Sequence, residues 1–434
     1  MTGIVISFFF VIDTFFQKTR FFASELKDMT ETVEVEETLD PNSTRGQISR
    51  FSALLSTQIK NNWQLNYPPE ARKQLRSFSS SEVADLVGIS PATLRQMSLD
   101  GEGPMPDRSE GNRRIYSLEQ INELRKFLAE RRPSQATSFD PQRRDGDKMQ
   151  VVAIANFKGG CAKTTTALHL AQFLALQGLR VLAIDLDTQA SLTEMLGVQP
   201  VLEVGDNETV FAVLRYDEER RTLPGVIRPT YFAGLDIVPG QSELQYFDYE
   251  TPAAIVSNNF LGDEYFIRRL ATSLRSVEDK YDVVVIDAPP QLSYLTLNAV
   301  YAATGLIIPV QSAMIDVASM NQFLYMLDEM LEQMAHFGAS VDHDFLRFLL
   351  TRHVPHDVPQ VNIAALLRSL FGESVLTSAV LETTAITNAG LENKTLYELE
   401  RGAVSRDTYN RAIEAVNAAN KEIYGEILKV WGRK

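Results

Sequence analysis

The sequence is poor in the residues that build disulfide frameworks, metal cages and membrane spans. Its 434 residues include five histidines and a single cysteine, Cys161. One cysteine cannot form an internal disulfide or a cysteine-based metal cage, which favours a reducing compartment. From residue 13 onward, no apolar run approaches the roughly 20 residues that a membrane-spanning helix needs. The composition therefore argues against a disulfide-stapled secreted domain and an integral membrane protein.

Positive charge is also in short supply. The chain has 42 Lys and Arg against 56 Asp and Glu, a net charge of −14. Almost all of this excess lies after residue 150, and the first 150 residues are nearly balanced. Any contact with DNA must therefore come from a local patch, which the amino-terminal third permits. The length predicts two domains with terminal extensions.

Residues 1–46 are expected to contribute no folded domain. The apolar run 3–12 has no basic residue before it and is followed by Asp13, so it is too short for a membrane span and unlike a signal peptide. We interpret residues 1–28 as the product of an upstream start codon, with an interfacial or partner-binding segment as the alternative. After Met29 the chain is acidic with little to bury, which predicts disorder over 30–46.

A single helix is predicted over 47–68. Apolar residues recur there at helical spacing, and two prolines follow. These residues are Ile48, Phe51, Leu55, Ile59, Pro68 and Pro69. With no partner helix next to it in sequence, this helix should pack on its own domain or on a second subunit.

Residues 77–132 have the spacing of a helix-turn-helix unit. Ser79 and Glu82 form a capping box for a helix that stops at Gly88, Ser90-Pro91 starts a second helix, and a third runs from Ser117 to Arg131. The side chains that would meet DNA are Thr93, Arg95 and Gln96 on the second helix, and Arg113 and Arg114 on a wing. Helix-turn-helix units also occur as pure structure, and that alternative stays open here.

The hydrophobic pattern of the sequence changes after a polar linker at 133–149. Runs rich in valine and isoleucine then alternate with helical patterns, at 151–155, 180–184, 235–238, 283–286, 306–310 and 346–350. Runs that are apolar on both faces indicate parallel strands covered by helices. We therefore predict that 150–434 is an α/β domain with a doubly wound, mostly parallel sheet, preceded by a small, mainly helical winged helix-turn-helix domain.

The segment 151–166 reads as a strand, a turn and a helix start that together bind phosphate. The turn consists of small residues, Gly159, Gly160, Cys161 and Ala162, whose backbone N–H groups can surround phosphate oxygens. Lys163 would lie on the β- and γ-phosphates, Thr164 on Mg²⁺ and Thr165 on the α-phosphate. An alternative role for Cys161 as a nucleophile is disfavoured, because the loop needs small residues and His169 is the one histidine nearby in sequence.

Two later strands end in carboxylates. Asp185 and Asp187 end the strand near 181–187, where their i, i+2 spacing should point both toward the mouth of the sheet. Asp287 ends the strand at 283–286 and would hold the Mg²⁺ shell through water. A glycine-rich loop alone is a weak signal, but the loop followed by two acid-tipped strands predicts an ATP site.

The sequence Lys-Gly-Gly-x-x-Lys-Thr-Thr at 158–165 resembles the deviant P-loop of the ParA and MinD ATPases. The resemblance covers nearly all of 150–434. It implies that Lys158 reaches across a homodimer to the partner's nucleotide and that Asp187 positions the attacking water. The family usually has proline where this chain has Thr188.

The helix-turn-helix unit resembles MerR-type domains, and more closely the amino-terminal domain of long plasmid partition proteins such as RepA of repABC-type replicons. This resemblance implies a cytoplasmic, nucleoid-associated, Mg²⁺-dependent ATPase that binds operator and non-specific DNA and represses its own operon. Its implied partner is a ParB-type centromere-binding protein that stimulates hydrolysis.

Three rival functions would each require features of their own. A redox ATPase resembling the nitrogenase iron protein needs two cysteines per subunit, which this chain lacks. A MinD-like membrane-positioning ATPase needs a basic amphipathic tail, whereas the apolar stripe over 411–431 is accompanied by Glu414, Glu422 and Glu426. An ATP-regulated transcriptional repressor without a role in segregation stays open.

Overall fold

The computed structural model describes residues 42–66, 73–109, 111–257, 265–336, 338–400 and 405–433. The chain divides into two compact units, 1–71 and 72–434, which are treated separately. The predictions for residues 1–28 and 30–41 lie outside the described residues.

The described part of the first unit is one helix, α2 (Thr44–Asn66). It begins three residues before the predicted start at 47, so residues 44–46 are helical where disorder was expected. The Ser43 hydroxyl accepts a hydrogen bond from the Gly46 N–H at 3.0 Å, which satisfies a free donor of the first turn. On the predicted apolar stripe, Ile48, Phe51 and Leu55 are each more than half exposed.

The second unit begins with the predicted helix-turn-helix domain. Its elements are β1 (Phe78–Ser79), α3 (Ser80–Val87), α4 (Pro91–Asp100), β2 (Asp107–Arg108), β3 (Arg114–Tyr116) and α5 (Leu118–Arg131). The three helices begin at the predicted caps, with reciprocal capping boxes at Ser79 and Ser117. Gly88 takes a left-handed φ of 77°, which ends α3 and allows the turn. The strands pair antiparallel in the order β1-β3-β2 and form the wing.

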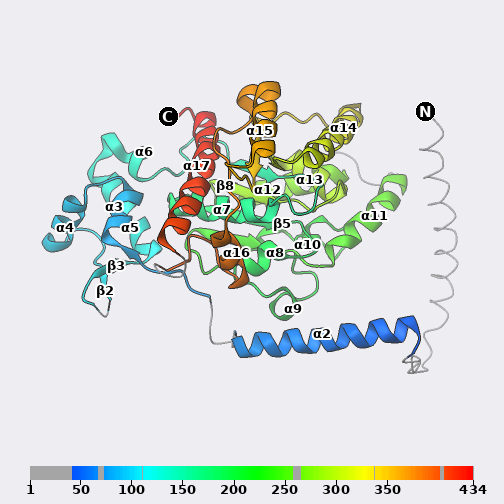
Figure 1. The fold of residues 1–434 in the computed structure, drawn as a ribbon, viewed down its shortest axis with the longest axis horizontal. Helices are drawn as coiled ribbons and strands as arrows, with labels where there is room; N and C mark the ends of the chain where they lie inside the picture. The colour runs from blue at the N-terminus through cyan, green and yellow to red at the C-terminus, as the bar shows by residue number, and fades with distance from the viewer. Residues whose placement is uncertain are drawn as a thin grey trace. The chain divides into compact units, whose positions relative to one another are not determined.

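The α/β domain carries a seven-stranded sheet in the order β10-β9-β4-β8-β5-β7-β6. Figure 1 labels two of its neighbouring strands, β5 and β8. The strands are β4 (Gln150–Ile154), β5 (Val181–Asp185), β6 (Arg228–Pro229), β7 (Leu235–Val238), β8 (Val283–Asp287), β9 (Gly305–Gln311) and β10 (Phe345–Thr351). All six predicted strands are present and pair parallel. The short edge strand β6, which pairs antiparallel with β7, was not predicted.

Helices cover both faces of this sheet. They are α7 (Lys163–Leu176), α8 (Ser191–Met195), α9 (Pro200–Glu203), α10 (Phe211–Leu214), α11 (Leu244–Ser257), α12 (Arg269–Leu274), α13 (Tyr294–Ala302), α14 (Met314–His336), α15 (Val358–Phe371), α16 (Thr384–Leu391) and α17 (Arg406–Val430). Successive strand residues enter two different cores. Val152 and Ile154 pack in the core that includes α7, α17 and the helix-turn-helix domain, while Val151 and Ala153 pack in the core that includes α12 to α15. This division explains why the strands are apolar on both faces.

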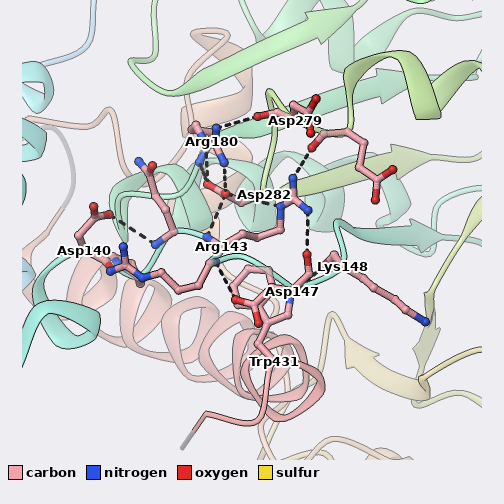
Figure 2. Close-up of polar contacts among 12 residues, drawn as sticks. Asp140, Arg143, Asp147, Lys148, Arg180, Asp279, Asp282 and Trp431 are labelled. Atoms are coloured by element: carbon pink, nitrogen blue, oxygen red, sulfur yellow. Dashed lines mark hydrogen bonds and ion pairs between the residues drawn. The ribbon is translucent and has the colours of Figure 1, made fainter.

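The segment predicted as a linker is bound to the α/β domain. It contains a short helix, α6 (Ala136–Phe139), and then crosses the amino-terminal edge of the sheet (Figure 2). The buried Asp282 carboxylate accepts from the backbone N–H groups of Arg143, at 3.1 Å, and Arg180, at 2.7 Å. The Trp431 indole N–H donates to the Lys148 carbonyl at 2.9 Å. The helix-turn-helix and α/β domains are therefore connected by a docked segment.

Candidate nucleotide site and DNA-contacting surface

The sheet order brings the predicted phosphate-binding residues to one edge. Strands β4, β8 and β5 are adjacent and parallel, so the loop after β4, the acid at the end of β8 and the acids at and just after the end of β5 meet at their carboxyl ends. This is the edge where parallel α/β sheets bind ligands. Gly159 and Gly160 are exposed in the loop, and α7 begins at Lys163 directly after it.

Two residues of the loop have left-handed backbone conformations. Gly160 has a φ of 77°, which glycine adopts without strain, and Ala162 has a φ of 69°. A left-handed conformation costs a residue with a Cβ roughly 1–2 kcal/mol. An ordinary P-loop has glycine at this position, so the substitution by Ala162 stores backbone strain at the amino terminus of α7.

Residues from neighbouring strand ends hold the loop in place, and the sequence interpretation missed them. Asn156 accepts from the Lys158 N–H at 3.1 Å and donates to the Pro309 carbonyl at 2.7 Å. Gln311 donates to the Gly160 carbonyl at 2.7 Å. Thr351 donates to the Cys161 carbonyl at 3.0 Å. Gln311 and Thr351 directly follow two predicted strands. Their position at the carboxyl ends of these strands was the sequence signal that could have placed them near the loop.

The two lysines of the loop make different contacts. Lys163 is buried, and its ammonium donates to the Lys158 carbonyl at 3.1 Å. The Lys158 ammonium forms an ion pair with Asp316, in the first turn of α14 of the same chain. The predicted reach of Lys158 to a partner's nucleotide therefore requires it to leave Asp316.

Asp287 has the surroundings expected of a carboxylate next to a cation. It is 1% exposed, and among the described residues neither of its oxygens has a hydrogen-bond partner. Burial, and then the neighbouring Asp185 carboxylate, raise the pKa of Asp287 well above its ordinary value, while Thr164 and Lys163 act in the opposite direction. A divalent cation would favour the ionised form, so this orphaned carboxylate fits a Mg²⁺ shell.

No three His, Cys, Asp or Glu side chains gather as a metal cage anywhere in the described ranges. At the nucleotide site, the groups proposed to hold a cation are the Thr164 hydroxyl and the Asp287 carboxylate. Such a sparse set suits Mg²⁺, which usually keeps several waters and takes phosphate oxygens as further ligands.

Of the two acids predicted to end this strand, Asp185 lies on β5 and Asp187 lies beyond it, so the prediction that both belong to the strand was wrong. The strand ends at Asp185, whose buried carboxylate accepts from the backbone N–H and the hydroxyl of Thr193 and from the Asp187 N–H. Burial raises the pKa of Asp185 to about 6. Asp187 lies past the strand end, is partly exposed, and accepts from the Gln189 N–H at 3.0 Å. Asp185 thus shapes the turn that carries Asp187.

Cys161 has the environment of a structural residue. It is 1% exposed, and its thiol donates to the Lys158 carbonyl at 3.2 Å. Burial raises the pKa of the Cys161 thiol, which disfavours the thiolate that a nucleophile needs. Thr165 is partly buried, and its carbonyl lies 2.8 Å from His169 Nδ1.

The predicted DNA-contacting side chains lie on α4 and the wing. Arg95 and Gln96 are exposed on α4, and Gln96 is bonded to Asp100 at 2.8 Å. Thr93 is partly buried, and its hydroxyl lies 2.8 Å from that of Ser90.

On the wing, Arg113 is exposed and Arg114 is partly buried. Arg108, which the sequence interpretation missed, pairs across the hairpin with Arg114 and donates to the Asn112 side chain at 2.9 Å. The wing therefore carries three arginines, because β2 brings Arg108 next to the predicted pair.

Comparison with known proteins identifies both domains. Residues 149–337 match the AAA domain family, and residues 79–116 match the MerR family of regulatory proteins. A protein of Sinorhizobium fredii named replication protein A is 46% identical over 387 residues, which is 89% of this chain and 93% of the relative. The chromosome-partitioning ATPase Soj of Thermus thermophilus is 30% identical over 63% of this chain and 98% of its own length. A solved structure of a partition protein shares the fold, with a TM-score of 0.61 and 21% identity over 90% of this chain and its whole length.

The chain belongs to the ParA family of P-loop ATPases, with a MerR-like domain ahead of the ATPase domain. Among the helices that the structure describes, none is long and apolar enough to cross a membrane. The apolar stripe of the last helix, α17, packs against the α/β domain, since Val416, Ile423 and Ile427 are buried in the core that α17 shares with α7.

Proposed function

We propose that this protein is a partition ATPase that dimerises on ATP, holds DNA in that state and releases it on hydrolysis. The observation that carries the proposal is the second lysine of the loop. Lys163 is bonded to the Lys158 carbonyl inside the loop, where it would serve the phosphates of its own site, while the Lys158 ammonium pairs with Asp316 of α14. The name of the Thermus thermophilus relative, a chromosome-partitioning ATPase, supports a role in segregation.

Each residue of the site has a proposed part in the chemistry. The loop 159–162 surrounds the phosphates with N–H groups, and Lys163 neutralises the β- and γ-phosphates. Thr164 and Asp287 hold Mg²⁺, which when bound screens the phosphate charge. Asp187 orients the attacking water. Lys158 of the partner stabilises the charge that develops on the transferred phosphoryl group.

The remaining parts of the chain fit the same cycle. The exposed stripe of α2 would add contacts between the subunits of the homodimer. The helix-turn-helix domain binds an operator and represses the protein's own operon, while non-specific DNA holds the dimer on the nucleoid of the cytoplasm. A ParB-type centromere-binding protein stimulates hydrolysis. The alternative, an ATP-regulated repressor without a segregation role, keeps the DNA binding but lacks stimulated turnover.

ATP turnover of the full chain separates these two functions. We expect slow hydrolysis alone and faster hydrolysis with duplex DNA and the product of the neighbouring gene. The Lys163→Gln variant should be inactive, because it loses the cation on the β- and γ-phosphates. Turnover that neither DNA nor the neighbouring product changes would favour the repressor.

A mixing experiment tests the role of Lys158 across the dimer. Lys158→Ala and Lys163→Gln subunits are each expected to be inactive. In a mixed dimer, one site would combine an intact Lys163 with the other subunit's Lys158, so some activity should return. Mixing Lys158→Ala with the double variant gives no complete site and is the matched control. If mixed dimers form, as shown with two different affinity tags, but no activity returns, Lys158 acts within its own subunit.

A further inference from the structure

The ends of three helices meet at one buried guanidinium, that of Arg125 in α5. Arg125 Nη2 donates to the Leu86 carbonyl at 2.6 Å and to the Leu176 carbonyl at 2.9 Å, and Nη1 donates to the Phe139 carbonyl at 3.4 Å. These carbonyls lie in the last turns of α3, α7 and α6. Arg125 is 4% exposed, so its contacts lie inside the molecule.

The contacts suit a buried cation, because the acceptors that Arg125 meets among the described residues are backbone carbonyls. The last carbonyls of a helix have no partner within the helix and carry partial negative charge, so they can share one positive charge. Burial lowers the pKa of Arg125 to about 10, which leaves the guanidinium charged at neutral pH. The fixed fork of arginine allows one side chain to reach several carbonyls, which the single ammonium of lysine does less well.

The three helices belong to different functional parts. The helix α7 starts at Lys163 of the phosphate-binding loop and ends at Leu176, so its 14 residues span about 20 Å from the nucleotide site to Arg125. The helix α3 is the first helix of the helix-turn-helix domain, called the DNA-reading unit below, and leads through Gly88 into α4. One side chain therefore joins the far end of the P-loop helix to the helix that supports the DNA-reading surface.

The backbone after α7 is shaped around this side chain. Gly178 has a φ of +97°, and a Cβ placed there would lie 2.8 Å from Cδ of Arg125. At the other end of α3, Arg76 pairs with Glu82 at 2.9 Å and donates to the Tyr397 carbonyl of the ATPase domain at 3.0 Å. Both ends of α3 are thus fixed to the ATPase domain, and the Arg125 contact leads directly to the end of α7.

We infer that Arg125 is the residue that couples the nucleotide site to the DNA-reading unit. A displacement of α7 when nucleotide binds at Lys163 would be passed through the Leu176–Arg125–Leu86 contacts to α3 and then to α4. Coupling between two binding sites is reciprocal, so DNA on α4 would change nucleotide affinity by the same factor. The DNA half of this inference rests on the proposed operator binding. The structural half, that nucleotide binding displaces α3, does not depend on operator binding.

The test uses the full chain with Mg²⁺ and the slowly hydrolysed analogue adenylyl imidodiphosphate. Two quantities are measured with and without the analogue. The first is the affinity for the duplex upstream of the protein's own gene, by fluorescence anisotropy, and the second is amide hydrogen exchange over residues 80–100. In the wild type we expect the analogue to change the affinity by about fivefold or more, within the usual range of coupling, and to change exchange in α3.

The variants separate coupling from simple stability. Arg125→Met should bring both analogue-dependent changes close to zero while the analogue still binds within about threefold of wild type. Gly178→Ala keeps the arginine but displaces it, and should reduce the changes in the same way. Arg131→Met is the matched control, because Arg131 lies on the same helix but is exposed and pairs with Glu102 of its own domain. It should keep both changes.

The outcomes distinguish the two proposals. If hydrogen exchange in the wild type responds to the analogue but the protein does not bind the upstream duplex, the proposed operator binding is wrong and the coupling stands. A wild type whose α3 exchange does not respond to the analogue overturns the coupling. The coupling also fails if Arg125→Met and Gly178→Ala keep the wild-type response. If Arg125→Met does not fold, Arg125→Lys takes its place, with partial loss of the response as the expected result.

Discussion

Lys158 of the phosphate-binding loop is held by Asp316 of α14 through an ion pair within one chain. Asp316 is nearly buried, while the Lys158 side chain keeps 29% of its surface exposed. Asp316 therefore binds the same ammonium group that, in the proposed dimer, contacts the other subunit's nucleotide. The free energy of this ion pair stabilises the monomer. On dimerisation, contacts between Lys158 and the partner's ATP phosphates must compensate for its loss.

We predict that Asp316→Asn strengthens ATP-dependent dimerisation. Loss of the carboxylate removes the competing partner of Lys158 in the monomer. A partly exposed ion pair contributes about 1 kcal/mol, and each of the two subunits gives up one such pair on dimerising. The gain should therefore be about 2 kcal/mol, or roughly thirtyfold in the dimerisation constant. Sedimentation velocity with ATP and Mg²⁺ measures it. Asp328→Asn, on an exposed part of the same helix, is the control and should have no effect. Weaker dimerisation would instead show that the dimer itself uses Asp316.

The strain at Ala162 gives a prediction about stability. Ala162→Gly should raise the free energy of unfolding by about 0.5–1 kcal/mol, because glycine adopts the observed φ of 69° without strain but loses more entropy on folding. Urea unfolding of the nucleotide-free protein measures the change. Ala175→Gly, inside α7, is the opposite control and should lower stability by about 1 kcal/mol or more. Equal effects at both positions would mean that Ala162 is not strained.

The sequence allowed much of the fold to be predicted, because the strands and caps carry local signals. Six buried strands were recognisable as apolar runs, and Ser79, Ser90 and Ser117 were recognisable as helix caps. The contacts of Arg125 and Asp316 could not be predicted. They join residues far apart in the chain, and an arginine or aspartate in a helix has the same local pattern whether it is exposed or buried.

The predicted strand that ends in Asp185 and Asp187 was too long for a related reason. The i, i+2 alternation on which that prediction relied applies only while the strand continues. Here β5 ends at Asp185, and the chain turns before Asp187. The short strand β6 was missed because two residues at a sheet edge leave no periodic signal.

The wing and α4 should contribute differently to DNA binding. Arg95→Ala, on the exposed face of α4, should lose roughly 1–3 kcal/mol of discrimination at one operator position. Arg114→Ala should weaken binding to all sequences alike and flatten the dependence on salt. Anisotropy titrations with operator and scrambled duplexes at several salt concentrations distinguish the two. Wild-type operator affinity in both variants would mean that the helix-turn-helix unit is purely structural.

Cys161 should be dispensable for chemistry. We expect Cys161→Ser to keep ATP turnover within a few-fold of wild type, because the loop needs a small residue there and burial already disfavours the thiolate. The wild-type thiol should also react slowly with iodoacetamide at pH 8, since it is 1% exposed. Complete loss of turnover in the serine variant, with ATP binding retained, would revive the nucleophile hypothesis.

The last prediction separates Asp185, which ends β5, from Asp187, which follows it. Asp187→Ala should bind ATP and dimerise like the wild type but hydrolyse poorly, because it loses the partly exposed carboxylate that we propose orients water. In the structure this carboxylate accepts a local hydrogen bond from the Gln189 N–H. The variant's unfolding free energy should barely change. Asp185→Asn should behave differently, because one oxygen that accepts two hydrogen bonds from Thr193 is replaced by a donor inside the core.

Leaving these donors without an acceptor costs about 1–3 kcal/mol. Asp185→Asn should therefore lose stability and also turnover, since the turn that carries Asp187 loses its anchor. Thr193→Val tests the same anchor from the other side and should reproduce part of both losses. The measurements are urea unfolding, ATP binding by equilibrium titration and steady-state hydrolysis on the same preparations. If Asp187→Ala turns over ATP normally, another residue orients the water, and if Asp185→Asn is as stable as the wild type, the Thr193 contacts do not shape the turn.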